Sequence, residues 1–310
     1  MTFATPGVST GGQFQYEDDA TMKRLLDGLG AIGARSIRFD VPWAMVERTR
    51  GTYDWTRADR AVAAARARGL DVELVLAYSP GWANGGREDK YPPLDAYFPD
   101  YARFAAECAR RYVPQGVKAF EIWNEPNLGG HFWKPAPEPE RYGRLLAQAY
   151  NAVKAVAPQA VVLGMALSGA PNDATNLTPN TFAKRAYAAG AKLDALSVHP
   201  YVNSTDIAFE WEGWQFGGTG SWFGPGSSVR QTMIDRGDGQ KKIWITETGD
   251  WVPSRAANSL RAQFSRWSTY SFAGPVFWYT YRDASIDPLS LTDSTWNPRP
   301  AWYAFRDWRK

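Results

Sequence analysis

The chain has 310 residues and a formal net charge of +3, with 35 basic and 32 acidic residues mixed along its length. This balance lacks the one-sided basic surface that binds nucleic acid, and no stretch approaches the roughly 20 apolar residues of a membrane span. Cys108 is the only cysteine, which excludes an internal disulfide. We expect a monomer with neither a nucleic-acid partner nor a membrane partner.

The amino terminus carries no recognisable export signal. The run MTFATPGVSTGG has neither the basic segment nor the long apolar segment that a secretory signal requires. The sequence leaves the localisation of the protein open, and it is compatible with one domain of a longer protein.

Short β-rich runs alternate with amphipathic helical patterns along the whole chain. The expected strands cover residues 2–8, 35–40, 71–78, 117–124, 160–167, 193–200, 242–247 and 275–281. The expected helices lie near residues 20–32, 57–68, 97–112, 139–157, 180–189, 227–236, 256–271 and 300–309. Gly69, Pro158 and Gly190 mark three of the helix ends.

Repeated strand-then-helix units predict an α/β fold, the (β/α)8 TIM barrel, which reaches about 250 residues as one domain. No repeat or Pro/Gly/Ser linker divides the chain, so we expect a single catalytic domain over residues 1–310 with a long insertion at 201–228. A doubly wound sheet is the alternative. The run PGVSTGGQF has glycines but not the G-x-G-x-x-G spacing that such a nucleotide-binding fold needs.

Two expected strands end on a glutamate. The run FEIWNEPN ends an apolar strand on Asn124 and Glu125. The run IWITE ends on Glu247, which we expect to continue an inward parity set by Ile243 and Ile245. Because catalytic groups of such barrels sit at the carboxyl ends of the strands, both glutamates are expected in one site.

Further polar side chains are expected at the same end of the barrel. Alternation points Arg38 and Asp40 inward on the second strand, while His199 and Tyr201 share one side of the sixth. Gathering such groups in an apolar barrel is costly unless they pair with each other or with a ligand. We expect Asp40 to brace Arg38, and Glu121 to pair inside the barrel or at its wall.

Two carboxylates with unlike neighbours are what the cleavage of a glycosidic bond requires. One protonates the departing oxygen, and the other attacks the anomeric carbon or activates water. The acid must stay protonated and the nucleophile ionised, which Tyr201 and Arg38 would favour for a nearby glutamate. Asn124 is positioned to bind a sugar hydroxyl next to the reacting carbon. A retaining mechanism predicts carboxyl groups about 5–5.5 Å apart.

The motifs IWNEPN, SVHPY and WITETG, in this order, resemble clan A of the glycoside hydrolases over nearly the whole chain. Arg38 on the second strand and Trp278 on the eighth extend the resemblance, which assigns them, together with Asn124, His199 and Tyr201, to substrate binding. It implies a retaining hydrolase in which Glu125 is the acid/base and Glu247 is the nucleophile, with an oligo- or polysaccharide as substrate.

Within the clan, the runs GARSIRFDVPWAMVER, GTYDW and AYSPGWA are most similar to family 39, with the family 5 cellulases as near neighbours. The segment from Ala77 to Pro80 departs from family 5, because many of those enzymes place a histidine there. No room follows the last expected helix for the accessory β-sandwich of several family 39 xylosidases. An open cleft and endo action are therefore expected.

Aromatic residues are expected around the mouth of the barrel. Five residues that follow expected strands are assigned to substrate binding: Trp43, Trp82, His131, Trp133 and Trp251. The insertion at 201–228 is long and rich in glycine, which is typical of functional loops. Its members Glu210, Trp211, Glu212, Trp214, Trp222 and Phe223 form either a wall for sugar rings or an aromatic mini-core that pins the loop.

No cofactor is expected, because His131 and His199 are too far apart in the sequence to indicate a zinc site and no cluster has metal-ligand spacing. A metal-dependent hydrolase barrel would need clustered His and Asp at the strand ends. The alternative function is a non-catalytic carbohydrate-binding barrel, against which the presence of both Glu125 and Glu247 argues.

Overall fold

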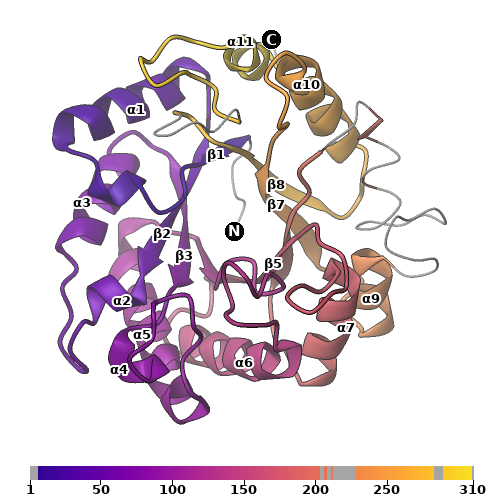
Figure 1. Cartoon of the computed structure of the whole chain (residues 1–310). Coiled ribbons are helices and arrows are strands. Elements are labelled where there is room, and N and C mark those ends of the chain that lie inside the picture. Colours follow the sequence, from indigo (N-terminus) through magenta and orange to yellow (C-terminus); the bar gives the residue numbers. More distant parts are fainter. Residues whose placement is uncertain (1–5, 203–205, 208–210, 212–227, 283–288, 309–310) are drawn as a thin grey trace.

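Eight parallel strands close into a barrel in the computed structural model (Figure 1), and each strand pairs with its neighbours in chain order. The strands are β1 (Gly7–Ser9), β2 (Ser36–Pro42), β3 (Asp71–Ala77), β4 (Ala119–Ile122), β5 (Val161–Ser168), β6 (Ala195–His199), β7 (Lys242–Thr248) and β8 (Ala273–Tyr279). Pairing of β1 with both β2 and β8 closes the sheet. The predicted (β/α)8 fold is confirmed.

Helices surround the barrel (Figure 1). The α-helices are α1 (Asp19–Ala31), α2 (Trp43–Val46), α3 (Thr56–Arg66), α4 (Gly81–Asn84), α5 (Phe98–Tyr112), α6 (Pro139–Val156), α7 (Pro179–Ala188), α9 (Val229–Asp235), α10 (Ala256–Trp267) and α11 (Pro300–Arg306). Short 3-10 helices also occur among the described residues: η1 (Phe14–Tyr16), η2 (Asp95–Tyr97) and η3 (Val113–Gln115). The helices predicted from periodicity are present, with ends that differ by a few residues.

The structure describes residues 6–202, 206–207, 211, 228–282 and 289–308. Within these ranges, none of the helices combines the length and the apolar character needed to cross a bilayer.

Two of the predicted helix ends depend on glycine. Gly69 and Gly190 follow α3 and α7 with φ values of 71° and 86°, in the left-handed region that glycine enters without steric cost. The side chain of Thr178 caps the start of α7 by accepting a hydrogen bond from the amide of Thr181. These signals explain why the chain leaves the helices where the sequence predicts.

The short elements α2 and α4 were not predicted. Each is a single turn that directly follows a strand, α2 after β2 and α4 after the segment that leaves β3. One turn contains too few residues to show a helical period, so the hydrophobic pattern carries no signal for it.

Apolar side chains pack in two places. The larger cluster lies between the strands and the helices, and it includes Ile37 and Phe39 on β2. A small cluster fills the barrel itself, with Ala119, Trp244 and Phe277 among its members. Buried charged and polar groups share the interior of the barrel with this small cluster.

Packing of α6 against α7 yields a stability prediction. A Cβ added at Gly143, inside α6, would lie 2.5 Å from the backbone oxygen of Ala186 in α7. Gly143→Ala should therefore destabilise the protein by about 1–3 kcal/mol in urea unfolding, as overpacking does. Gly30→Ala is the matched control, since this helical glycine in α1 has nothing within 4 Å. It should be neutral or stabilise by up to about 1 kcal/mol. Equal effects at the two sites would contradict this packing.

Candidate active site

A cavity of about 330 Å³ opens at the carboxyl ends of the strands. Its lining consists of Gly11, Gly12, Gln13, Tyr16, Asp40, Pro42, Tyr78, Asp89, Lys90, Asn124, Glu125, Phe132, Glu247 and Tyr279. Residues from the ends of β2, β4, β7 and β8 thus meet in one place. The structure brings Glu125 and Glu247 together although they are far apart in the sequence.

Glu125 reaches the cavity through a turn in an uncommon backbone conformation. β4 ends at Ile122, and the residues on either side of Asn124 have positive φ values, 69° for Trp123 and 42° for Glu125. Non-glycine residues enter this region rarely, and such strain persists only where the surroundings impose it. Trp123 is fully buried, and its indole donates a 2.7 Å hydrogen bond to the carbonyl of Phe132. This anchor holds the turn that presents the amide and the carboxylate side by side.

Glu247 reaches the same cavity through an irregularity in β7. Ile245 pairs with Val276, and Thr248 pairs with Trp278. Between these two pairs β7 advances by three residues while β8 advances by two. The expected inward parity of Ile243 and Ile245 is wrong, because both pack against the helices. The extra residue on β7, a local bulge, turns Glu247 toward the cavity.

The surroundings of Glu247 favour its ionised form. Its carboxylate accepts a hydrogen bond from Arg38 Nη1 at 2.5 Å and one from the Tyr201 hydroxyl at 2.6 Å. Burial by itself raises the pKa of Glu247, but the charges of His199 and Arg38 and these hydrogen bonds outweigh it and lower the pKa below its usual value. The group is therefore a carboxylate at neutral pH, as a nucleophile must be.

Glu125 has a different neighbour, the imidazole of His199. Nδ1 of His199 lies 2.7 Å from Glu125 Oε1, and Nε2 lies 3.0 Å from the Thr246 hydroxyl. That hydroxyl donates its single hydrogen to Glu121, so it must accept one from Nε2. The contact between Nδ1 and Glu125 Oε1 then carries one proton, whether an imidazolium faces a carboxylate or a neutral imidazole faces a carboxylic acid. The network therefore keeps one proton between Glu125 and His199.

The two carboxylates are close. An oxygen of Glu125, an oxygen of Glu247 and a ring nitrogen of His199 all lie within 4.8 Å of one another. Inverting glycosidases need roughly 6.5–9.5 Å between their carboxyl groups to admit a water molecule, so the shorter separation fits a retaining enzyme. In the described part of the chain this is the one cluster of acids and histidines with metal-ligand geometry. Both ring nitrogens of His199 already have protein partners, which leaves no free lone pair for a metal.

Arg38 connects the interior of the barrel to the site. The side chain is fully buried, and all five of its N–H donors are used. Nε and Nη2 bind Glu121 at 2.8 and 2.6 Å, and Nη2 also binds Asn124 at 2.9 Å. Nη1 binds Ser9 at 3.1 Å in addition to Glu247. The prediction that Glu121 pairs inside the barrel is confirmed.

Glu73 lies deeper in the barrel beside the same guanidinium. Nε of Arg38 is 3.5 Å from Oε1 of Glu73, and both carboxyl oxygens of Glu73 lack a hydrogen-bond partner. Burial above all, and the charge of Glu121, raise the pKa of Glu73 well above its usual value despite Arg38. Glu73 is therefore uncharged at neutral pH, and the Arg38 charge serves Glu121 and Glu247.

Asp40 faces the cavity instead of Arg38. The expectation that it braces Arg38 is wrong, because the guanidinium has no donor left for it. The carboxylate is 7% exposed and receives no hydrogen bond from the described residues, although Gln15 donates to its backbone carbonyl. Burial, opposed by the charge of Arg38, raises the pKa of Asp40 to about 6.

Two of the predicted substrate contacts lie in the core. Trp43 and Trp133 are fully buried, and their indoles donate to the carboxylates of Glu47 and Glu138 at 2.6 and 3.1 Å. The structure contradicts a role in substrate contact for both. Trp82 is half-buried and donates to the carbonyl of Glu47, and it does not line the cavity either.

Strand β8 presents a tyrosine to the cavity rather than the predicted tryptophan. Trp278 is fully buried against the helices and donates to the carbonyl of Leu289 at 2.9 Å. Alternation along β8 instead turns Phe277 into the barrel and Tyr279 into the cavity. The assignment of Trp278 to substrate binding is therefore wrong by one residue.

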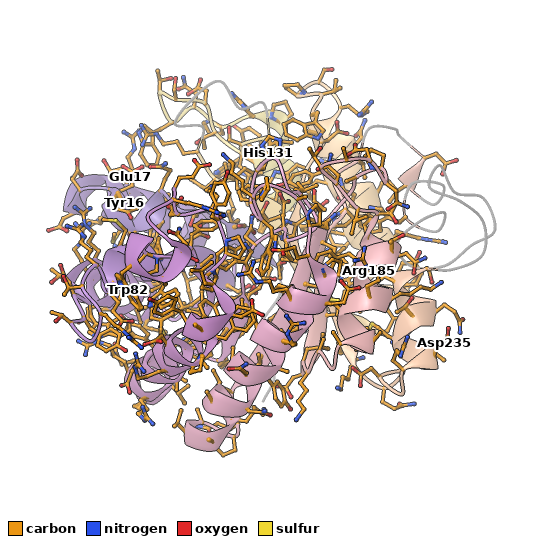
Figure 2. All side chains as sticks on the ribbon, turned by 60° about the horizontal axis from the view of Figure 1, so that its bottom comes forward. Tyr16, Glu17, Trp82, His131, Arg185 and Asp235 are labelled. Atoms are coloured by element: carbon orange, nitrogen blue, oxygen red, sulfur yellow. The ribbon has the colours of Figure 1, made fainter. Side chains whose placement is uncertain are left out.

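Trp251 and His131 stand at the surface. Trp251 is 49% exposed, and its ring lies 5.6 Å from that of Tyr201, which binds Glu247. His131 is exposed and its ring lies 6.2 Å from Phe132, which lines the cavity. Figure 2 labels His131 in the upper middle of the view, while Tyr16 and Trp82 lie in the indigo and purple half of the molecule.

The insertion at 201–228 is described only in part. Trp211 is fully buried, donates to the carbonyl of Pro200 at 3.1 Å, and packs edge-on against Trp267 of α10. This indole pins the segment to the barrel, as in the mini-core alternative. The other candidates for a sugar wall lie outside the described residues: Glu210, Glu212, Trp214, Trp222 and Phe223.

Several lining residues were missed by the sequence analysis. Tyr78 directly follows β3, so the rule applied to the other strand ends would have found it. Lys90 lies over the rings of Tyr78 and Phe132, with Nζ at 4.4 and 4.5 Å from their centres. Tyr16 reaches the cavity from η1, after β1. Loop residues such as Lys90 and Tyr16 carry no periodic signal.

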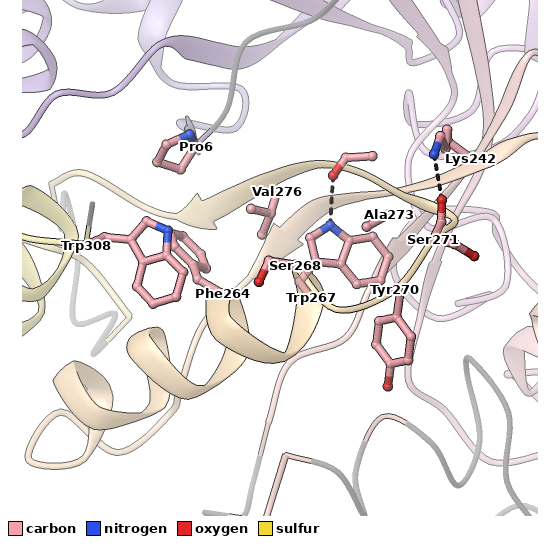
Figure 3. A pocket seen from close by; sticks show the side chains of 11 residues that line it. Pro6, Lys242, Phe264, Trp267, Ser268, Tyr270, Ser271, Ala273, Val276 and Trp308 are labelled. Atoms are coloured by element: carbon pink, nitrogen blue, oxygen red, sulfur yellow. Dashed lines mark hydrogen bonds between the residues drawn. The ribbon is translucent and has the colours of Figure 1, made fainter. Parts of the chain in front are cut away.

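A second cavity, of about 260 Å³, lies at the opposite end of the barrel (Figure 3). It adjoins Lys242 and Ala273, the first residues of β7 and β8, and α10 covers it with Trp267. The Trp267 indole donates to the carbonyl of Gly274 at 2.8 Å. Its described lining contains no carboxylate. Acid–base chemistry therefore belongs to the first cavity.

The family model described as Cellulase (glycosyl hydrolase family 5) matches residues 1–250, so the chain belongs to glycosyl hydrolase family 5. No curated protein sequence matches the chain. The resemblance to clan A is confirmed, with family 5 taking the place that the motifs assign first to family 39.

Solved structures share the fold. A family 39 glycoside hydrolase from the gut symbiont Bacteroides cellulosilyticus WH2 has a TM-score of 0.74 at 21% identity, over 97% of this chain and 63% of that one. A monomeric β-xylosidase from Caulobacter crescentus CB15 has a TM-score of 0.74 at 18% identity, over 98% and 67%. GH5_18 from Streptomyces cattleya, in complex with GlcNAc, has a TM-score of 0.69 at 18% identity, over 99% and 82%. The chain thus spans about two thirds of the first two.

The unpartnered carboxylate of Asp40 predicts a pH-dependent stability. Because its folded-state pKa of about 6 lies above the ordinary aspartate value of 3.8, Asp40 favours folding most at low pH, and this contribution is lost as the pH rises through about 6. Asp40→Asn should therefore be more stable than the wild type by about 2 kcal/mol at about pH 7.5 in urea unfolding. The difference should shrink toward about pH 4. An Asn variant less stable than the wild type at both pH values would contradict an unpartnered carboxylate.

Proposed function

We propose that this chain is a retaining glycoside hydrolase that cleaves an oligo- or polysaccharide by double displacement. Glu125 is the general acid/base and Glu247 is the nucleophile. The observation that carries the proposal is the pair of carboxyl groups within 4.8 Å of each other in opposite environments, one receiving donors and the other sharing a proton.

In the first step, the carboxylate of Glu247 attacks the anomeric carbon while Glu125 gives its proton to the departing oxygen. The glycosidic C–O bond breaks, and an ester forms between the sugar and Glu247. Tyr201 and Arg38 hold the attacking carboxylate in place by hydrogen bonds to its two oxygens. Both donors have partners before substrate arrives, so the site needs little reorganisation.

In the second step, Glu125 has lost its proton and acts as the base. It takes a proton from a water molecule, which attacks the anomeric carbon from the face that the leaving group vacated. The Glu247 ester breaks, and the sugar leaves with its original configuration. His199 positions Glu125 throughout, and Thr246 keeps the imidazole in the required tautomer.

Asn124 orients the sugar. Its Oδ1 accepts from Arg38, which leaves its NH2 group to donate within the cavity, since no described residue accepts from it. A hydroxyl beside the anomeric carbon is the natural acceptor. Arg38 itself has no free donor, so it is a positioning residue rather than a substrate ligand.

Extended binding is the finer part of the proposal. Tyr16 is 39% exposed in the cavity lining, and Trp251 is 49% exposed beside Tyr201, so both offer aromatic faces for sugar rings. His131 adds a polar contact at the same mouth. We propose endo action on a β-linked substrate by a monomer. A structural neighbour named as a monomeric β-xylosidase supports the β linkage and the monomeric state. Another neighbour is named as an exo-β-1,4-mannosidase, so the mode of attack differs from the endo action that we propose.

Substitutions should separate the roles of the two glutamates. Glu247→Ala should abolish hydrolysis of every glycoside, because no other group at that strand end can attack the anomeric carbon. Glu125→Ala should spare the first step for an activated aryl β-glycoside, whose phenolate leaves without a proton, while turnover falls by about 10²–10⁴-fold. Steady-state and burst kinetics with aryl glycosides of different leaving groups measure both effects. Glu107→Ala, on the outer helix α5, is the control and should behave as the wild type.

Azide tests the same assignment by its product. With Glu125→Ala it should restore turnover and yield a β-glycosyl azide, because the small anion replaces water without needing a base. With Glu247→Ala any rescue should give the inverted azide. Sensitivity to the leaving group at Glu247 rather than at Glu125 would reverse the two roles.

Endo action is tested by the sizes of the first products. With end-labelled oligosaccharides and the polymer from which they derive, cleavage at internal linkages should yield products of intermediate length at early times. Release of monosaccharide alone from one chain end would show exo action and leave the catalytic proposal intact.

A further inference from the structure

We infer that Asp40 is a further substrate-binding residue, one that accepts hydrogen bonds from hydroxyl groups of an uncharged sugar bound beside Glu247. The inference rests on the proposed function and deepens it, because it names the class of sugar that the cavity selects.

The first observation is the placement of the side chain. Asp40 lies near the end of β2, and it lines the cavity that Glu125 and Glu247 also line. Its backbone is fixed, because its carbonyl accepts from Gln15 Nε2 at 2.9 Å and its amide donates to the carbonyl of Gly11 at 3.4 Å. The backbone therefore holds the carboxylate in position without engaging its oxygens.

The second observation is the missing partner. Several other buried acids among the described residues have basic donors: Glu121 and Glu247 bind Arg38, Asp250 binds Arg255, and Asp100 binds Arg50. Glu73 also lacks a partner, but it lies below the site and is uncharged. Asp40, at 7% exposure, combines a near-complete loss of water with a place in the lining of the cavity. A buried acceptor without a donor is costly, and a ligand that supplies donors removes the cost.

The room beside the carboxylate is adequate for a hydroxyl. A Cβ added at Gly12 would lie 3.2 Å from Asp40 Oδ2, so the glycine keeps that oxygen accessible. The rings of Tyr16 and Tyr78 line the same cavity and offer surfaces to the apolar faces of a sugar.

The charges of the lining decide which sugars fit. Among the described residues, the lining contains the acids Asp40, Asp89, Glu125 and Glu247, and Lys90 is the one cation. The Lys90 ammonium is directed over the rings of Tyr78 and Phe132. A sugar that bears a carboxylate or a sulfate would meet repulsion from Asp40, whereas hydroxyl groups supply the hydrogens that its oxygens lack. The site therefore selects a neutral glycone.

The test compares Asp40→Ala and Asp40→Asn with the wild type on aryl β-glycosides. The panel contains the best neutral sugar, its monodeoxy analogues and the corresponding uronide. Asp40→Ala should lower kcat/KM on the parent sugar by about 10- to 100-fold, the loss that follows from removing a hydrogen bond to a charged group. On one or two of the deoxy analogues, Asp40→Ala and the wild type should have nearly equal kcat/KM values, because these analogues lack the hydroxyl that Asp40 binds. The ratio of uronide to parent activity should rise in both variants.

Asp89→Asn is the matched control, because it removes a charge from the same cavity at an exposed position. It should show no dependence on any single hydroxyl. Equal losses on the parent and on every deoxy analogue would overturn the inference, since they would indicate a structural effect. Unchanged kinetics in Asp40→Ala would overturn it as well. Urea unfolding of Asp40→Asn distinguishes the two explanations. A residue that only supports the fold would lose stability and activity together on substitution. A substrate-binding Asp40 predicts that the variant gains stability and loses activity.

Binding measurements separate this inference from the proposed function. Calorimetry of the neutral parent oligosaccharide with the wild type and with Asp40→Ala needs no turnover. If the wild type hydrolyses no glycoside but Asp40→Ala binds the saccharide about 10-fold more weakly, the proposed function fails and the role of Asp40 stands. If the wild type hydrolyses glycosides and Asp40→Ala binds and turns over as the wild type does, the role of Asp40 fails alone.

Discussion

The site depends on the guanidinium of Arg38 inside the barrel. This one group ties Ser9 on β1, Glu121 on β4 and Glu247 on β7 to β2, and it also binds Asn124. A buried cation is tolerated only with paired anions and satisfied donors, and removal of either partner leaves an uncompensated charge. The position of Glu247 is therefore coupled to the integrity of the barrel interior, and the uncharged state of Glu73 leaves the positive charge for the carboxylates that use it.

From this arrangement two chemically identical side chains acquire opposite properties. Glu247 receives donors from Arg38 and Tyr201, which stabilise its ionised form. Glu125 lies against His199, whose other nitrogen is committed to Thr246, so a proton stays at the Glu125 side of the cavity. The separation of charge and proton over a few ångströms is what a double displacement uses. Asp40 differs from both, because its carboxylate lines the cavity and receives no hydrogen bond from the described residues.

Much of this arrangement follows from the sequence. Alternation of strands and helices predicts the barrel, and parity along β2 correctly turns Arg38 and Asp40 inward. Parity fails where the backbone is irregular, because the bulge in β7 reverses the expected roles of its isoleucines. On β8 alternation holds, and it places Tyr279 in the cavity in place of the Trp278 that the resemblance indicates. Trp43 was misassigned because the single turn α2, which follows β2, carries its indole into the core, and the hydrogen bond of Trp133 to Glu138 holds that indole in the core as well. The lack of a donor for the Asp40 carboxylate among the described residues depends on tertiary contacts, which no local sequence pattern indicates.

The central claim is that Glu247 carries the sugar between two steps. It is tested most directly by incubating the protein with an activated 2-deoxy-2-fluoro glycoside of its best substrate, which slows the second step more than the first, and by mapping the labelled peptide by mass spectrometry. We expect one fluoro sugar per chain, bound to the peptide that contains Glu247. Addition of an acceptor sugar should remove the label and restore hydrolytic activity. A label on the peptide that contains Glu125, or hydrolysis with inverted configuration and no label, would contradict the account.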